Sequence, residues 1–222
     1  MRPVPRSIAP LTARNNFELK ENLFPKLISY LFHPLLLPTL GLLLIFNMDR
    51  SGLWVPDGEV QLFLLSITFI ATFLLPLLNA LLLLKMKQIS SLAMESRQER
   101  KLPYLAAAVF YFTESYFLMN WDVPALIKAF MLGATLLVVS VLLINLFWKI
   151  SAHMVGIGGL CGIMIAVSER LQINMHGTII ALFLIAGCTA FSRLKLNAHD
   201  PAQVYVGFLL GVSVQLFLFL PA

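Results

Sequence analysis

Two histidines, several arginines and lysines, and small hydroxyl side chains lie in three short polar segments of an otherwise apolar chain. These segments are residues 97–101, 151–153 and 192–203. A guanidinium group binds phosphate oxygens through two parallel hydrogen bonds, and an imidazole ring can attack phosphorus or transfer a proton. If the segments meet, arginines would neutralise the phosphoryl oxygens while one histidine attacks and a second protonates the leaving oxygen. The residue types therefore predict phosphoryl transfer.

The composition indicates that helices embedded in a membrane position these segments. Hydrophobic residues make up 59% of the 222 residues and charged residues only 12%, far from the average of soluble domains. Several apolar runs reach the roughly 20 residues that a helix needs to cross a bilayer. The runs are continuous and do not alternate as the strands of a membrane barrel do. We therefore expect an all-α fold, a polytopic transmembrane helix bundle with about six or seven spans.

Seven apolar segments are the expected spans. Six of them are residues 27–46, 60–84, 102–119, 123–148, 175–191 and 204–220, and a short one follows His153 and ends near Val167. Together they form one domain, residues 27–222. A basic tail, residues 1–26, precedes this domain, and a short interfacial helix is expected within it near residues 17–24.

Prolines, glycines and one acidic residue inside the spans predict how the helices bend and pack. Pro34 and Pro38 lie in the first span and predict a kink there, and the expected role of His33 is a hydrogen bond at this kink rather than a place in a site. Glu114, near the far end of the third span, is expected at the membrane interface rather than buried as a functional acid. The glycines of the fifth span favour close helix packing, and a phosphate-binding loop is rejected because the run is apolar: Gly156, Gly158, Gly159 and Gly162.

The lysines and arginines are distributed unequally between the two sides of the expected bundle. Thirteen of the sixteen fall on the side of the tail, and three, Arg50, Lys128 and Arg170, fall on the other. Loops rich in lysine and arginine stay in the cytoplasm, so the tail side is predicted to be cytoplasmic. An even number of spans separates the three polar segments from one another. They are therefore expected on this same side, close to one membrane surface.

The three polar segments resemble, in order, the three motifs of the type-2 phosphatidic acid phosphatase superfamily. The third family motif is Ser-Arg-x5-His-x3-Asp, and Ser192-Arg193 followed after five residues by His199 matches it. The second is Pro-Ser-Gly-His, and Ser151-Ala152-His153 is similar, with isoleucine in place of proline and alanine in place of glycine. The first, Lys-x6-Arg-Pro, is matched only in character by residues 97–103. The resemblance covers about residues 97–220.

The resemblance implies a role for each candidate residue. His199 would be the nucleophile that forms a phosphohistidine, and His153 would be the acid for the leaving group and then the base for water. The family acts without a metal or another cofactor. The remaining candidates would hold the phosphate or support the site: Arg193, Arg100, Arg97, Lys101 and Ser151 in the first role, and Gln203, Asp200 and Ser192 in the second.

The resemblance also implies a substrate and a location. The substrate would be a lipid phosphate or diphosphate, such as polyprenyl diphosphate, phosphatidylglycerophosphate, phosphatidate or a lipid A type. The partners would be this lipid and the bilayer, with no nucleic acid, and the protein would be integral to a bacterial inner (plasma) membrane. Bacterial members of the family usually act at the outer face, whereas the charge count predicts the cytoplasmic face. One miscounted span would reverse the count.

Gln203 stands where the family motif has an aspartate that orients the nucleophilic histidine. A carboxylate fixes the imidazole tautomer and stabilises its cation, whereas an amide only orients the ring. Three outcomes are open: Gln203 suffices with lower activity, Asp200 substitutes from a turn set by Pro201, or catalysis is lost. Two other functions also stay open. One is a non-catalytic protein that binds lipid phosphate or acts as an assembly factor. The other is a transporter whose polar segments only anchor topology, with His153 and His199 far apart.

Overall fold

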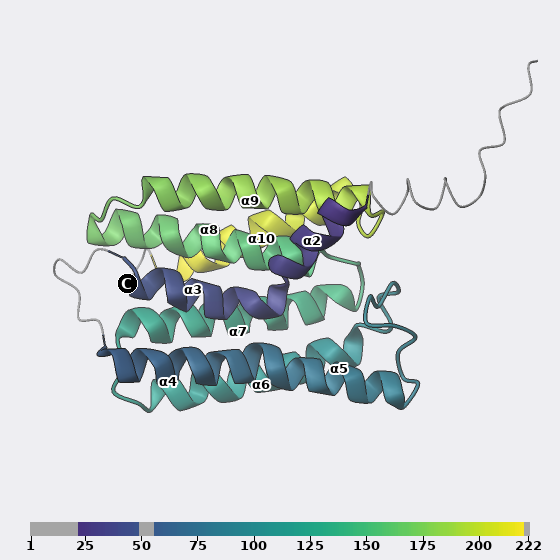
Figure 1. The fold of residues 1–222 in the computed structure, drawn as a ribbon, viewed down its shortest axis with the longest axis horizontal. Helices are drawn as coiled ribbons and strands as arrows, with labels where there is room; N and C mark the ends of the chain where they lie inside the picture. The colour runs from purple at the N-terminus through teal and green to yellow at the C-terminus, as the bar shows by residue number, and fades with distance from the viewer. Residues whose placement is uncertain (1–21, 49–55, 220–222) are drawn as a thin grey trace, which may run out of the picture.

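The computed structural model describes residues 22–48 and 56–219. These residues form helices without a strand, and the longest described connection, residues 86–100, joins α5 to α6. The helices lie roughly parallel or antiparallel to one another in a single bundle (Figure 1). Six of them are long and apolar enough to cross a membrane. The expected all-α transmembrane bundle is therefore confirmed, and the chain is an integral membrane protein.

The helices follow one another in an up-and-down order. In chain order they are α2 (Leu23–Leu31), the 3₁₀ turn η1 (Pro34–Leu36), α3 (Leu37–Phe46), α4 (Gly58–Phe69), the π-helical turn η2 (Ile70–Leu74), α5 (Leu75–Lys85), α6 (Lys101–Met119), α7 (Ala125–Asn145), α8 (Ala152–Leu171), α9 (His176–Lys195) and α10 (Pro201–Phe219). The helix α6 is not among the six candidate spans, but it runs antiparallel alongside α7 over a similar length (Figure 1).

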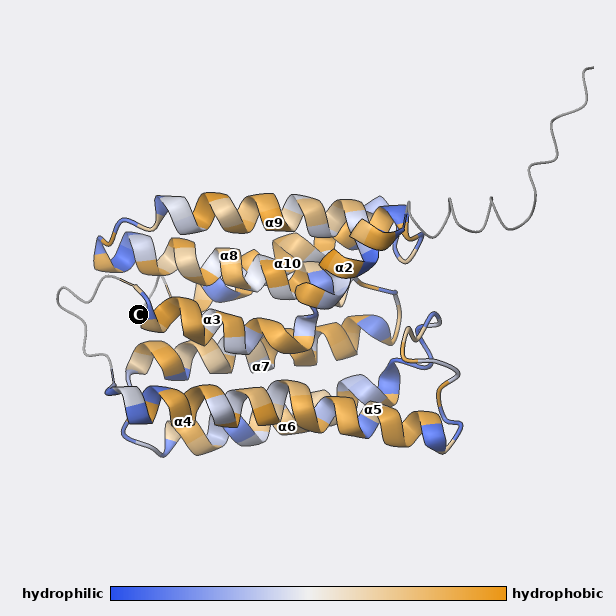
Figure 2. Cartoon of the chain, viewed as in Figure 1, coloured by the Kyte–Doolittle hydropathy of each residue, from blue (hydrophilic) through white to orange (hydrophobic). Residues whose placement is uncertain are grey.

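Hydrophilic residues gather at the two ends of the bundle, and hydrophobic residues cover the length between them (Figure 2). The connections α5–α6, α7–α8 and α9–α10 all lie at the end where α2 begins (Figure 1). The three polar segments of the sequence are thus brought to one end of the bundle, as the count of spans predicts. The membrane side to which this end belongs stays a prediction.

The first span is broken where the sequence predicts a kink. Pro34 has no N–H to continue α2, and the chain turns through η1 before α3 begins. The His33 Nδ1 atom accepts a hydrogen bond from the Leu35 N–H, at 3.3 Å, and so caps this turn. The candidate span begins at Leu23, so Lys26 belongs to α2 and not to a tail. Residues 1–21 of the predicted tail, which include most of the interfacial helix expected near residues 17–24, lie outside the described residues.

Helix α8 is the centre of the bundle, and nearly all its side chains from Met154 to Val167 are buried. It packs most closely against α10. A Cβ atom on Gly158 would collide with the Phe208 backbone, and one on Gly211 would collide with the backbone of α8. The predicted role of the α8 glycines in close helix packing is therefore confirmed.

Several helix boundaries differ from the predicted spans, and the end of α9 moves candidate residues. Helix α9 continues to Lys195, so Ser192 and Arg193 lie in its last turn and not in a loop. Only residues 196–200 connect α9 to α10. Helix α8 likewise continues to Leu171, beyond the predicted end near Val167. Polar residues are tolerated in these last turns because they lie at the ends of the bundle.

Glu114 is buried and not interfacial. Its side chain is 3% exposed, and Oε1 accepts a hydrogen bond from the Thr68 hydroxyl at 2.5 Å. The sequence prediction was wrong because Glu114 faces α4, where Thr68 offers a donor, and not the end of the bundle.

Candidate anion site

Four helix ends converge on the two histidines of the polar segments. His153 lies in the first turn of α8, Arg193 in the last turn of α9, and His199 in the connection that leads into α10. The charge on Arg193 acts on both imidazole rings, and the two rings act on each other. Arg100, directly before α6, acts on His199 as well. We call Arg100, Lys149, His153, Arg193 and His199 the anion cluster.

His199, Gln203 and Asp200 form a chain of hydrogen bonds at the start of α10. His199 Nδ1 donates to Gln203 Oε1 at 2.7 Å, and Gln203 Nε2 donates to Asp200 Oδ2 at 2.7 Å. The other Asp200 oxygen accepts from the Gln203 backbone N–H at 2.9 Å and so caps α10. The amide thus connects a carboxylate to the imidazole that it cannot reach directly.

This chain sets the tautomer of His199. The Asp200 oxygens only accept hydrogen bonds, so the Gln203 amide must turn its NH₂ group toward them and its oxygen toward the ring. The ring then carries its proton on Nδ1, and the Nε2 lone pair stays free. His199 is 8% exposed. Burial and the nearby Arg100, Arg193 and Lys149 charges lower its pKa to about 3, against the opposing effect of the Gln203 bond. The imidazole is therefore neutral at neutral pH, in the tautomer that a nucleophile at Nε2 needs.

Ser29 of α2 contacts two members of the cluster at once. His153 Nε2 donates to the Ser29 carbonyl at 3.1 Å, and Arg193 Nη1 donates to the Ser29 hydroxyl at 3.2 Å. Two oxygens of one residue are thus held by an imidazole and a guanidinium. His153 Nε2 and Arg193 Nη1 are therefore close enough to reach the same residue of α2.

His33 lies in the same surroundings, although its predicted role is a hydrogen bond at the kink. Its ring meets the His153 ring edge-on, with 5.4 Å between centroids, while its Nδ1 atom accepts from Leu35. The predicted hydrogen bond at the kink is therefore confirmed, and His33 also lies beside His153. Three of the four histidines of the chain gather at this end, and His176 lies at the other end of α9.

Several polar groups in the cluster have unused hydrogen-bonding capacity. Arg193 Nε and the Ser151 hydroxyl are buried without a partner. Ser151 also precedes α8 without capping it by its side chain, which leaves the first N–H groups of this helix for an anion. Lys149 is half-buried, and burial, followed by the charges of Arg100 and Arg193, lowers its pKa. Glu95 and Asp200 act on Lys149 in the opposite direction. The partly desolvated cations of the cluster favour the binding of an anion.

Not every predicted phosphate ligand points into the cluster. The Arg97 guanidinium donates to the Leu146 carbonyl at 2.6 Å and ties the α5–α6 connection to the end of α7. Lys101 is exposed at the start of α6. Ser192 is fully buried, and its hydroxyl donates to the Cys188 carbonyl within α9. Arg100 is 6% exposed, binds the Met94 carbonyl through Nε at 2.8 Å and interacts with Tyr104, while its charge acts on His199.

Three residues at the site were not among the predicted site residues. Lys149 lies two positions before Ser151, and its closeness to the polar segment 151–153 was the available signal. Ser29 carries no such signal, because a serine in an apolar helix is common and only tertiary packing brings it to Arg193. Tyr104 likewise interacts electrostatically with Arg100 and Arg193, from a position one turn inside α6.

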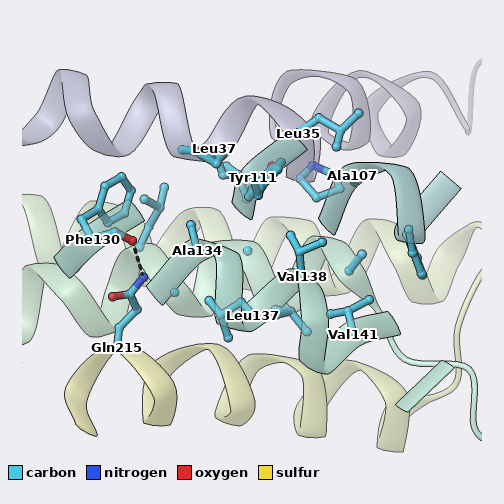
Figure 3. A pocket seen from close by; sticks show the side chains of 18 residues that line it. Leu35, Leu37, Ala107, Tyr111, Phe130, Ala134, Leu137, Val138, Val141 and Gln215 are labelled. Atoms are coloured by element: carbon cyan, nitrogen blue, oxygen red, sulfur yellow. Dashed lines mark hydrogen bonds between the residues drawn. The ribbon is translucent and has the colours of Figure 1, made fainter. Parts of the chain in front are cut away.

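An apolar cavity of about 90 Å³ lies beside the cluster, between η1 and helices α3, α6, α7 and α8. Its lining includes Ala152, which adjoins His153, Tyr104, which acts on Arg100 and Arg193, and Pro34, which adjoins His33. Further inside, Tyr111 and Phe130 line it, and Gln215 donates to the Phe130 carbonyl at the opposite end (Figure 3). The cavity thus reaches from the polar end of the bundle into its hydrophobic interior.

In the described part of the chain, no three His, Cys, Asp or Glu side chains are grouped as they would be around a metal ion. Comparisons with models of known protein families, with curated proteins and with solved structures gave no match. The resemblance of the motifs therefore stays an expectation, and a function must be inferred from the geometry of the cluster.

Proposed function

We propose that this protein is an integral-membrane phosphohydrolase that removes a phosphate group from a lipid through a phosphohistidine. The observation that carries the proposal is the double contact with Ser29. An imidazole of α8 and a guanidinium of α9, forty residues apart in sequence, hold two oxygens of one residue. A phosphate that displaced Ser29 would meet the same two donors.

In the proposed first step, His199 Nε2 attacks phosphorus, a P–N bond forms and the P–O bond to the lipid breaks. His153 must enter this step as an imidazolium; it gives one proton to the leaving oxygen and is left neutral. Arg193, Arg100 and Lys149 neutralise the charge that develops on the phosphoryl oxygens. The His199 proton on Nδ1 stays with the ring and is held by Gln203 Oε1.

In the proposed second step, water attacks phosphorus and gives one proton to His153. The P–N bond breaks, inorganic phosphate leaves, and His199 recovers its Nε2 lone pair. His153 thus returns to its protonated form and is ready for another turnover. The Asp200 charge, transmitted by the Gln203 amide, stabilises His199 while it carries the phosphoryl group.

The surroundings of the cluster support a lipid as the substrate. The cluster lies at the polar end of a bundle whose outer surface is hydrophobic (Figure 2). The apolar cavity starts beside Tyr104 and Ala152 and has room for a short stretch of hydrocarbon chain. A phosphate held in the cluster would therefore carry its chain along or into the bundle.

The test is phosphate release by the purified, reconstituted protein from phosphatidate, phosphatidylglycerophosphate or polyprenyl diphosphate. His199→Ala and His153→Ala should each abolish release, whereas His176→Ala, at the other end of α9, should leave it unchanged. Equal activity of all three variants and the wild type would show that another site or a contaminant releases the phosphate.

A second function, the binding of lipid phosphate without turnover, is favoured by one observation. The group that touches His199 Nδ1 is the neutral Gln203 amide, which stabilises an imidazolium less than a carboxylate does. In this case, vesicles with lipid phosphate would bind in an Arg193-dependent manner, and neither released phosphate nor a phosphohistidine would form.

A further inference from the structure

Glu114 is a buried acid that the anion site does not use. It projects from α6 toward α4 and η2, away from the end of the bundle at which the cluster lies. Its side chain is 3% exposed, in a helix packed between α5 and α7. An acid inside a membrane protein is costly to keep and is usually functional.

The hydrogen bonds around Glu114 suit a neutral carboxylic acid and not a carboxylate. Oε1 is bonded to the Thr68 hydroxyl, and Oε2 is buried without a partner. An ionised carboxylate offers about four acceptor sites and needs several donors or a cation when it is removed from water. The single Thr68 hydroxyl does not supply enough hydrogen-bond donors for a buried carboxylate, whereas protonation of the carboxyl group removes its charge.

The neighbouring helices supply no charge, within the described residues, that would hold Glu114 ionised. The ionisable groups of the packed elements lie at helix ends: Glu59 in the first turn of α4, Lys85 in the last turn of α5, and Lys128 near the start of α7, where it donates to the Met119 carbonyl. The ionisable side chain that interacts with Glu114 from nearby is Tyr111, one turn away on α6. Tyr111 is neutral at physiological pH in any ordinary environment.

The partner of Glu114 belongs to an irregular part of the structure. Thr68 lies just before the π-helical turn η2, and such turns occur often at functional sites. Thr72, within η2, donates to the Thr68 carbonyl at 2.8 Å and to the Leu35 carbonyl of η1 at 3.1 Å. Two threonines therefore link Glu114 to the segment that carries His33.

We propose that Glu114 and Thr68 form a proton-binding site inside the bundle, in which the Glu114 carboxyl group carries a proton at neutral pH. Loss of this proton leaves a buried charge with a single hydrogen-bond donor. The bundle must then admit water or a cation between α4 and α6. Proton occupancy at Glu114 thus holds the α4–η2–α5 segment against α6 and, through Thr72, supports the position of η1. This proposal does not depend on the phosphohydrolase activity.

Infrared spectroscopy of the protein in bilayers tests this proposal directly. An ordinary glutamic acid is protonated in only about 1 of 500 molecules at pH 7. We expect the wild type to show, at pH 7, a protonated carboxyl C=O band that shifts in D₂O. Glu114→Gln should lose this band, and Glu95→Gln, in an exposed loop, should keep it.

A second variant keeps the proposal testable if Glu114→Gln fails to fold. Thr68→Val removes the hydrogen bond to Oε1 and should move the same band to higher frequency. The proposal is overturned if the wild type has no such band at pH 7, or if the band is the same in Glu114→Gln. It is also overturned if added Na⁺ removes the band at constant pH, because the site would then be a sodium site.

Discussion

Asp200→Asn is the sharpest perturbation of the proposed nucleophile, because it changes no atom of His199. The backbone N–H of Gln203 donates to one side-chain oxygen of residue 200, so an asparagine must turn its oxygen there. Its NH₂ group then faces the position that Gln203 Nε2 occupies. Two donors cannot pair, so the Gln203 amide must flip. The flipped amide offers its NH₂ group to His199 Nδ1, and the ring proton moves to Nε2. The nucleophilic lone pair is lost.

The size of the effect follows from the cost of restoring the reactive tautomer. To return the proton to Nδ1, the variant must leave one donor–donor contact at the Gln203 amide, which is buried although residue 200 is exposed. A buried donor without a partner costs about 1–3 kcal/mol, and about 1.4 kcal/mol corresponds to a tenfold change in rate. We therefore expect Asp200→Asn to lower kcat by about 10- to 100-fold with little change in KM. Asp122→Asn, which replaces an exposed carboxylate at the other end of the bundle, is the matched control.

A compensating variant separates this reasoning from a general loss of structure. In the double variant Asp200→Asn with Gln203→Glu, the NH₂ group of the introduced asparagine donates to one oxygen of the introduced carboxylate, and His199 Nδ1 donates to the other. The reactive tautomer returns with the same net charge as the wild type, and activity should recover relative to the single variant. Nitrogen NMR of labelled histidine should report the tautomer of each variant, even without turnover. An Asp200→Asn protein with unchanged tautomer and activity would refute the reasoning, as would a double variant no better than the single one.

Three further predictions concern the cluster and its support. The folded pKa of His199 is about 3, against about 6.5 for an unperturbed histidine. Its imidazole should therefore stay neutral, and its NMR signals should not change, from pH 8 down to about pH 5. A titration midpoint between about pH 6 and 7 would contradict the burial argument. Ser29→Ala removes the hydroxyl that competes for Arg193. Orthovanadate, a phosphate mimic, should then bind about 2- to 10-fold more tightly in a calorimetric titration. Weaker binding would show that Ser29 is a ligand and not a competitor. Gly211→Val places a side chain against the α8 backbone and should lower the free energy of unfolding by about 1–3 kcal/mol. The variant should unfold at a lower temperature in detergent, whereas Gly187→Ala, with open space around it, should not. Equal unfolding temperatures for Gly211→Val and the wild type would contradict the packing argument.

Most of the fold follows from the sequence because the bilayer imposes a simple rule. Every backbone polar group must bond within its own helix, so long apolar runs such as residues 125–145 can only be helices. The break at Pro34 follows as well, since proline lacks the N–H that α2 would need. The ends of α8 and α9 were harder to place, because Arg170 and Arg193 are polar yet remain helical at the ends of the bundle.

The site could be predicted in part, for reasons that depend on each residue. His153 and His199 could be predicted because an ionisable residue beside an apolar span is costly and is usually functional. The Asp200–Gln203 pair has a sequence signal too, since aspartate before proline, with glutamine three residues later, is typical of a capped helix start. Because this pattern is explained by a helix cap alone, it did not indicate that the same two residues also orient an imidazole.

Other parts of the site depend on tertiary contacts that no local pattern contains. Ser29 meets Arg193 across 164 positions of sequence, and nothing near Ser29 indicates this contact. Arg97 has the same residue type and neighbourhood as Arg100, but a carbonyl just beyond the end of α7 takes its guanidinium. Glu114 was misplaced because distance from a helix end says nothing about which neighbouring side chain it meets.

The most direct test of the central claim is to trap phosphate on the chain. The protein is mixed with a ³²P-labelled lipid phosphate, quenched within a turnover in alkali, which preserves phosphohistidine, and digested for mass spectrometry. We predict label on His199 Nε2 in the wild type, more label in His153→Ala with an aryl phosphate whose leaving group needs no acid, and none in His199→Ala. Release of phosphate without any label on His199 would contradict the account.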